Sequence, residues 1–233
     1  MYHSITFGDK NTWDDWHLIS KSRPLFNPPE IKTHYVDVPG GDGVIDLTTV
    51  LTGRPMFGNR TGSLDFYVDN DFKAWTHMYS EIMEYLHGQK MRAILEDDPK
   101  YYYEGRFSVN SWKSEAERSS ISIDYNVAPY KKSVQSSVED WIWDTFNFET
   151  DIAFVYTGIT VSTERTIVVV GGSMPVIPKI VCSAAMQVVF RGVTYQLNAG
   201  ENYLNGIVIQ NGENLITFKG NGTVAIHFAW GKL

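Results

Sequence analysis

One stretch of the chain has the hydrophobic spacing of an amphipathic helix. Large apolar side chains recur there at intervals of three and four residues, at Phe72, Trp75, Tyr79, Ile82 and Leu86. This spacing lays one apolar stripe along a helix. Asn70 or Asp71 can cap its N-terminus, and Gly88 lies where a glycine commonly follows the last helical turn. We therefore predict a single helix in the first half of the chain.

The rest of the first half alternates polar and apolar residues, or forms the short runs typical of strands. Residues 62–68 alternate well, with Leu64, Phe66 and Val68 on one side. The strands predicted in this half cover residues 4–7, 15–19, 31–38, 44–47, 62–68, 90–95, 101–112 and 119–127. The first half therefore consists of strands around one helix.

The second half has no helical period and is built from short β-branched runs. They cover residues 152–156, 164–170, 176–181, 186–190, 193–197, 206–210, 214–219 and 223–230. Turn residues separate them, at Gly171-Gly172, Arg191-Gly192, Asn198-Ala199-Gly200, Asn211-Gly212 and Gly220-Asn221-Gly222. The pair Asn211-Gly212, between two apolar runs, predicts a two-residue hairpin. About eight strands in about 100 residues predict an antiparallel sandwich.

The distribution of charge indicates a boundary between two domains. Residues 1–133 carry 15 Lys and Arg and 19 Asp and Glu, whereas residues 134–233 carry only 5 and 8. The change occurs near a short polar stretch, residues 128–133, that contains Pro129. We therefore predict an N-terminal domain of residues 1–133 and a C-terminal domain of residues 134–233.

Composition narrows the class of protein. A chain of 233 residues with 43% hydrophobic content can bury a sizeable core. It has no apolar run of the roughly 18 residues that a membrane helix needs, and its start, MYHSITFGDK, does not resemble a signal peptide, so we expect no membrane partner.

Cys182, the only cysteine, cannot form an internal disulfide and is expected to be buried. The net charge of −7 argues against a protein that coats DNA but would suit a channel wall past which DNA slides.

No group of residues predicts a catalytic, cofactor-binding or metal-binding site, so we assign no residue to these roles and expect no cofactor. The cluster Gly40-Gly41-Asp42-Gly43 lacks the GK[ST] sequence and the following helix of a phosphate loop. Asp37, Asp42 and Asp46 do not have the spacing of an EF-hand loop. The six histidines form no HExxH motif and no close pair.

Two clusters leave other functions open. Glu96-Asp97-Asp98 lies beside Tyr101-Tyr102-Tyr103, which could stack on a sugar, and a glycosidase needs only two carboxylates. A glycan-cleaving enzyme acting through Glu96 or Asp98 is therefore one hypothesis, although a solvated turn is the simpler interpretation. Trp141-Ile142-Trp143, followed by Phe146 and Phe148, is either a strand packed into the sandwich or a sugar-binding platform.

The most specific segment is residues 36–53, VDVPGGDGVIDLTTVLTG, in which a glycine-rich turn joins two strand-like runs. YHSITFGDKNTWDDWHLI precedes it, and FGNRTG, a strand and a helix ending in YLHGQ follow. Because these segments follow one another in this order, the chain resembles the distal tail proteins (Dit) of bacteriophages with long, non-contractile tails. The resemblance continues at residues 143–148, 174–178, 200–203 and 220–224, although Trp230-Gly231-Lys232-Leu233 replaces the family's usual basic-Gly-Ser-Leu ending.

The resemblance implies a mainly β fold with one α-helix. The N-terminal domain would be barrel-like or sandwich-like and carry a hairpin arm, and the C-terminal domain would be a galectin-like antiparallel β-sandwich. Six copies of such proteins form a ring through the N-terminal domain, and the arm embraces the neighbouring copy. Residues 36–53 and residues 88–112 are both candidates for the arm. The second half leaves no room for an inserted carbohydrate-binding module.

We therefore expect a non-enzymatic structural virion protein at the tail tip of a siphovirus, made in the bacterial host cytoplasm and encoded by a free phage or by a prophage. It would form a homohexameric hub that connects the tail tube protein to the tail-tip or baseplate proteins, including fibres or receptor-binding proteins. DNA would pass through the ring without specific binding. The alternative is a carbohydrate-binding adhesin that acts through the C-terminal sandwich.

Overall fold

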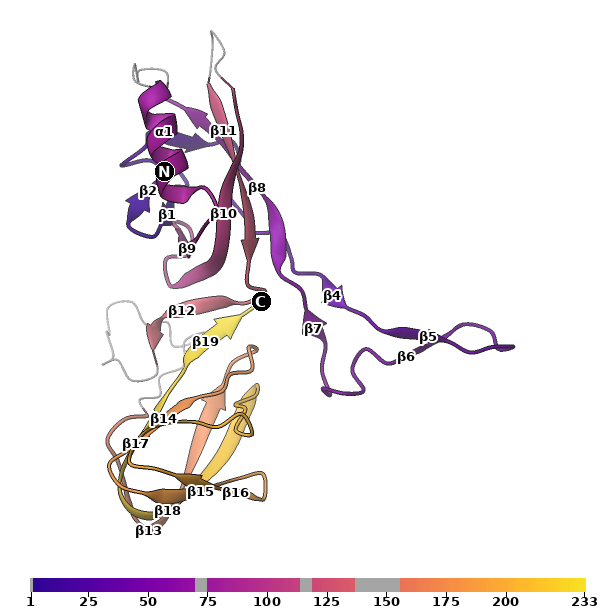
Figure 1. Ribbon diagram of the computed structural model, residues 1–233, viewed down its shortest axis with the longest axis vertical. Coiled ribbons are helices and arrows are strands. Elements are labelled where there is room, and N and C mark those ends of the chain that lie inside the picture. Colours follow the sequence, from indigo (N-terminus) through magenta and orange to yellow (C-terminus); the bar gives the residue numbers. More distant parts are fainter. Residues whose placement is uncertain (1, 70–74, 114–118, 137–155) are drawn as a thin grey trace. The chain divides into compact units, whose positions relative to one another are not determined.

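Figure 1 shows the computed structural model, which describes residues 2–69, 75–113, 119–136 and 156–233. The chain is mainly β, with one helix among the described residues, as predicted. Its internal contacts divide it into two compact units, Met1–Lys131 with Leu233, and Lys132–Lys232. Each unit has its own apolar core. That the two units are separate folding domains, as the predicted boundary implies, stays a prediction.

The first unit is built on a long antiparallel sheet in which the strands lie in the order β2-β1-β9-β10-β11-β8-β3. Their bounds are Ile5–Phe7 (β1), Lys10–Asn11 (β2), Leu18–Ser20 (β3), Arg60–Val68 (β8), Gln89–Leu95 (β9), Tyr101–Lys113 (β10) and Ser120–Val127 (β11). Alternate residues of a strand point to one face. Phe7, Phe66, Phe107 and Ile123 lie on such positions and are fully buried in the core.

The helix α1, Trp75–Leu86, packs its apolar side on this core. Ile82 and Leu86 are fully buried, as the predicted stripe requires, but Met78 is buried in place of Tyr79. Trp75 and Tyr79 are only partly buried and pack at the margin of the core. Gly88 follows the helix with a φ of 74°, the conformation predicted for it. Asn70, Asp71 and Phe72 lie outside the described residues.

The strand predicted at residues 15–19 is wrong in its first half. Asn11 accepts hydrogen bonds on its side-chain oxygen from the backbone N–H groups of Trp13 (2.8 Å) and Asp14 (3.2 Å). The Asp15 carboxylate in turn accepts from the backbone N–H of Asn11 at 2.7 Å. Such local side-chain bonds compete with strand pairing. The segment therefore turns, and the strand β3 begins only at Leu18.

Four short strands lie between β3 and β8, and they form the part of the first unit that projects from the sheet (Figure 1). Ile31–Lys32 (β4) pairs with Met56–Phe57 (β7), and Tyr35–Asp37 (β5) pairs with Val44–Asp46 (β6). The predicted strand 31–38 is thus two strands, whereas 44–47 agrees with β6.

In the second unit the strands of the main sheet lie in the order β16-β15-β18-β14-β17, and β13 pairs with the long strand β18. Their bounds are Ile159–Gly171 (β13), Lys179–Cys182 (β14), Met186–Phe190 (β15), Val193–Leu197 (β16), Gly200–Tyr203 (β17) and Gly212–His227 (β18). The remaining strands, Lys131–Ser136 (β12) and Ala229–Lys232 (β19), pair with each other. The pairings between β13 and β18 are antiparallel along their full register.

The break predicted at Gly220-Asn221-Gly222 is wrong, because β18 runs through it. On one side of β18, residues 216–219 pair with β15 and residues 224–227 pair with β14, so the strand changes neighbours at the two glycines. Gly220 and Gly222 have φ angles of 143° and 148°. A Cβ atom on Gly220 would lie 2.8 Å from Cβ of Met186. The glycines therefore mark a bend with close packing, and not a turn that ends the strand.

The segment before β18 also differs from the prediction. Residues 206–210 form only an isolated bridge, between Val176 and Ile209, so Asn211-Gly212 does not join two strands. The Asn214 side chain holds this connection: its Oδ1 accepts from the N–H of Gln210 (3.0 Å) and its Nδ2 donates to the Gln210 carbonyl (2.7 Å). Asn202 makes the same two bonds to Asn198, at 2.9 and 2.8 Å, and thereby orders β17, which was not predicted.

Cys182 is buried as predicted, and burial raises the pKa of its thiol. Most of the predicted strand 152–156 lies outside the described residues, as do Trp141, Trp143, Phe146 and Phe148. The helix of the described structure is too short and too polar to cross a membrane.

Candidate functional site

The projecting segment, residues 31–57, is the part of the described structure that departs most from a compact fold, and we call it the arm (Figure 1). Of the two predicted candidates for an arm, residues 36–53 form its outer part. Residues 88–112 instead build β9 and β10, in the interior of the main sheet. The segment 36–53 is therefore the one whose surface is available to another molecule.

The arm exposes an unusual number of large apolar side chains. Leu51 is 97% exposed and Val50 is 65% exposed. The other exposed apolar side chains of the arm are Ile31, Tyr35, Val36, Val38, Val44 and Ile45. A two-stranded hairpin without a core is marginally stable in water, and a contiguous exposed apolar patch marks an interaction surface. The arm thus has the surface expected of a segment that is covered in an assembly.

The tip of the arm is shaped by its glycines. Gly40 and Gly43 have φ angles of 79° and 77°, a conformation that side chains with a Cβ rarely adopt. Beyond β6, the side chain of Thr48 accepts from the N–H of His34 at 3.1 Å, and the N–H of Thr48 donates to Asp46 at 2.8 Å. These hydrogen bonds from Thr48 lower the pKa of Asp46.

The root of the arm is anchored by a buried cation. Arg60 is 6% exposed and donates from Nε to the Pro129 carbonyl (2.8 Å) and from Nη1 to the Asn27 carbonyl (2.9 Å). Asn27 also donates its N–H to the Tyr125 hydroxyl, at 2.8 Å. Gly62 leaves room for this contact, because a Cβ atom there would lie 2.4 Å from that hydroxyl. The outer arm is exposed, but both chain segments at its root are fixed to the sheet.

Sequence reasoning did not single out Arg60. It lies in the FGNRTG motif that helped to define the resemblance, but the motif by itself does not reveal a buried guanidinium. A usable signal is Gly62, two residues later, since a glycine in an alternating strand can mark a close approach by another group.

The acidic cluster Glu96-Asp97-Asp98 has structural partners in this fold. Glu96 accepts from the N–H of Ser4 at 2.8 Å, and Asp98 pairs with Lys131 at 2.5 Å. Asp97 accepts from Nδ1 of His3 (2.9 Å) and Nε of Arg23 (3.1 Å). Partial burial raises the pKa of Asp97, but the bonds from His3 and Arg23 outweigh it and lower the pKa overall.

The neighbouring tyrosines do not form an open sugar platform. Tyr102 and Tyr103 are buried, and Arg92 lies 4.5 Å above the ring of Tyr102. The two carboxylates of the glycosidase hypothesis, Glu96 and Asp98, are bonded to Ser4 and Lys131 of the same chain and do not face an open aromatic surface. The geometry therefore favours the interpretation of this cluster as a structural turn that ties the N-terminal strand to the sheet.

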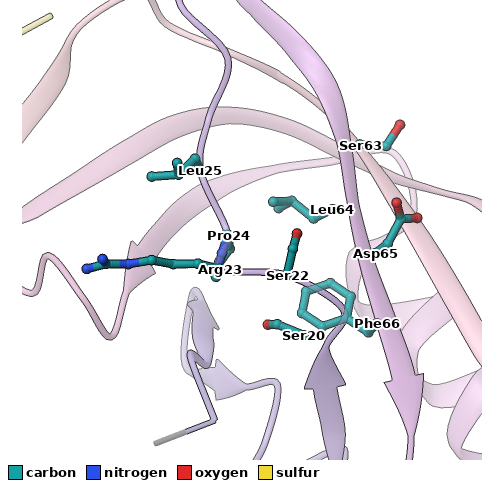
Figure 2. Close-up of a pocket in the computed structure, with 9 residues that line it drawn as sticks. All are labelled: Ser20, Ser22, Arg23, Pro24, Leu25, Ser63, Leu64, Asp65 and Phe66. Carbon is teal, nitrogen blue, oxygen red and sulfur yellow. The ribbon is translucent and has the colours of Figure 1, made fainter.

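A small pocket lies between β8 and the segment after β3, with a volume of about 190 Å³. Its lining residues are Ser20, Ser22, Arg23, Pro24, Leu25, Ser63, Leu64, Asp65 and Phe66. Figure 2 shows the Arg23 side chain pointing away from Ser63 and Asp65, so the polar groups do not converge on one point. Ligand sites are usually larger, about 300–1,000 Å³, and present convergent polar groups. The pocket does not have the form of a small-molecule site.

Within the described parts of the chain, no three His, Cys, Asp or Glu side chains are placed to hold a metal ion. The absence of a metal or cofactor stays a prediction. The candidate platform Trp141-Ile142-Trp143 lies outside the described residues, so the structure gives the carbohydrate-binding hypothesis no support from that segment.

The fold belongs to the class seen in distal tail proteins of phages. The chain aligns with the crystal structure of SPP1 Dit (gp 19.1), which is described as a paradigm of the hub adsorption apparatus in phages that infect Gram-positive bacteria. The alignment covers 100% of both chains with a TM-score of 0.62 and 13% sequence identity. No protein-family model matches the sequence, and no curated protein matches it. The comparison therefore shows a shared fold over the full length of the two chains.

Proposed function

We propose that this chain is a structural protein of a phage tail tip, a distal tail hub that assembles as a homohexameric ring. The observation that carries the proposal is the fold shared with SPP1 Dit along the whole of both chains. A likeness in one common sandwich would say little about function. Here the alignment covers 100% of both chains, and therefore both units of this one.

The arm supports the assembly part of the proposal. It exposes aliphatic side chains on a hairpin that has no core of its own, and its root is fixed by Arg60. A contact between the arm of one copy and a different surface of the next is heterologous, and such contacts close into a ring when the rotation permits. The first unit, which carries the arm, is accordingly the ring-forming part.

The proposed hub would join the tail tube protein on one face to the tail-tip, fibre or receptor-binding proteins on the other. The second unit would point outward as a galectin-like sandwich. DNA would pass through the centre without specific contacts, in keeping with the net charge of −7. The protein would be made in the host cytoplasm and reside in the virion tail, and its function would lie in its interfaces and not in catalysis.

The test is the assembly state of the purified full chain at high concentration, measured by light scattering and negative-stain images. Six-fold rings with a central hole are the expected result. A particle of another symmetry, or none at any concentration, would contradict the hexameric hub.

A further inference from the structure

The two faces of the arm hairpin differ in chemistry. Residues directly opposite each other in an antiparallel pair share a face. Tyr35 pairs with Asp46 and Asp37 pairs with Val44, so both carboxylates lie on one face. The other face carries the aliphatic pair Val36 and Ile45. All these side chains are exposed. We call the first face, made by Tyr35, Asp37, Val44 and Asp46, the acidic face of the arm.

The outer arm has a single sign of charge. Residues 33–53 contain Asp37, Asp42 and Asp46 but neither Lys nor Arg. All three aspartates are exposed, and an exposed aspartate is ionised at neutral pH. A surface that covers this part of the arm must therefore accept negative charge, and a basic surface would do so most favourably.

A basic surface lies on β9 and β10, on the side of the sheet away from the core. Tyr103 and Ala93 are register partners that point into the core, so the adjacent pairs Arg92–Glu104 and Lys90–Arg106 point out of it. Lys90, Arg92 and Arg106 are exposed. We call these three residues the basic strip.

The basic strip contains an unfavourable arrangement that an acidic partner would relieve. Lys90 and Arg106 lie directly opposite each other in the strand pairing, and like charges in that position repel. Glu104 is the acidic member of this group and lies 3.8 Å from Nζ of Lys90. Arg106 donates from Nη1 to the backbone carbonyl of Gly88, which leaves its positive charge in place. The three cations of the strip thus have one neighbouring anion on this side of β9 and β10.

The arm and the strip of one chain do not meet. Both are exposed, and in Figure 1 the arm points away from β9 and β10 of its own unit. Two complementary surfaces at different places on one chain can be satisfied by a second copy, in a head-to-tail contact. We propose that the acidic face of the arm docks on the basic strip of a neighbouring copy. This inference rests on the proposed ring and names the surface that receives the arm.

Charge reversal in the full chain tests the contact. One double variant reverses the charges of the arm, Asp37→Lys with Asp46→Lys, and a second reverses those of the strip, Lys90→Glu with Arg106→Glu. Each should weaken self-association at least about tenfold, since each places like charges against each other. A chain that carries all four substitutions should associate again. Raising the salt from about 0.05 M to about 0.5 M should weaken association of the unaltered chain, because the contact is between exposed charges.

The control is Arg165→Glu with Lys219→Glu, at exposed positions of the second unit, which changes the net charge by the same amount as Lys90→Glu with Arg106→Glu. It should leave association unchanged. Light scattering over a concentration series gives the association constant of each variant, and circular dichroism verifies that each is folded.

The outcomes separate this inference from the proposed function. If self-association is lost in both double variants and recovered in the variant with all four substitutions, the docking of the arm on the strip is supported. A further variant replaces residues 34–47 by a short Gly-Ser loop. If this variant no longer associates but Lys90→Glu with Arg106→Glu associates normally, the basic strip is not the receiving surface, although the arm still forms the ring. Association that survives both changes overturns any docking by the arm. A strict monomer at every concentration overturns both proposals.

Discussion

The arm and the sheet from which it projects are built from the same kind of sequence and reach opposite states of burial. Both contain aliphatic and aromatic residues set among polar ones. In β8 and β11 the apolar set, including Phe66 and Ile123, is fully buried, whereas in β5 and β6 Val36 and Ile45 remain exposed. The difference is that the sheet has a core to cover and the arm has none within its own chain. The apolar residues of a strand thus indicate a surface that becomes buried, but they do not indicate which molecule covers it.

The largest expected effect separates the two regions by stability. Phe107 is fully buried and packs edge-on to Phe7, with ring centroids 5.0 Å apart. Phe107→Ala should lower the free energy of unfolding by about 3–5 kcal/mol, because the cavity cannot be refilled. Leu51→Ala, on the arm, should change it by less than about 0.5 kcal/mol. Urea denaturation of both variants gives the comparison, and equal losses would show that the arm packs on the unit after all.

The root of the arm should show an intermediate effect, since it belongs to both regions. Arg60→Ala leaves the carbonyls of Pro129 and Asn27 without their donor and should cost about 2–3 kcal/mol of unfolding free energy. Arg60→Lys keeps the charge but not the two-pronged geometry, and should cost less than the alanine variant. Thermal unfolding of the three proteins tests this order. A neutral Arg60→Ala would mean that the root is held by other contacts.

A smaller change should distinguish stability from assembly. Val36→Ser with Ile45→Ser removes the aliphatic face of the arm. We expect an unfolding free energy within about 0.5 kcal/mol of the unaltered chain but association weakened about tenfold or more, since burying each side chain contributes about 1.5–3 kcal/mol. Denaturation and light scattering on the same samples measure the two quantities. The matched control is Thr194→Ala with Gln196→Ala, at exposed positions of β16, which should leave both quantities unchanged.

The smallest effect concerns pH. The pKa of Asp97, on the sheet, is lowered by His3 and Arg23 against an opposing effect of burial, and that of Asp46, on the arm, is lowered by Thr48. A lowered folded-state pKa contributes stability above the unfolded value of 3.8 that is lost as pH falls through the folded value. Asp97→Asn should therefore flatten the acid limb of the unfolding curve. Asp46→Asn should flatten it less, because the hydrogen bonds that lower the pKa of Asp46 come from Thr48, two residues away, and can persist when the sheet unfolds. An equal flattening by both would contradict the separation of arm and sheet.

Local signals predicted several elements of the fold well. The strands β15 and β16 have the predicted bounds, residues 186–190 and 193–197. The reason is that Arg191-Gly192 specifies its turn locally: both residues have positive φ, at 49° and 80°, as a two-residue hairpin requires. The helix was equally clear from its apolar spacing, although Met78 and not Tyr79 completes the buried line.

The misses arose where a distant contact decided the structure. Gly220 and Gly222 resemble a turn in the sequence, but β15 and β14 pair with β18 on either side of them and keep it extended. Asn202 and Asn214 each close a loop to a residue four positions earlier, and they also donate to the carbonyls of Ile180 (3.4 Å) and Val169 (3.2 Å) on other strands, which the sequence does not reveal. The arm itself was one of two candidates, since no local pattern distinguishes an exposed hairpin from β9 and β10, which the sheet buries.

The claim that the arm is an assembly surface can be tested most directly by amide hydrogen exchange of the full chain at low and high concentration. If the arm is the assembly surface, amides in residues 33–53 become protected only at concentrations where the particle mass rises, while those of β10 and β18 are protected throughout. Assembly without any gain of protection in residues 33–53 would contradict the claim.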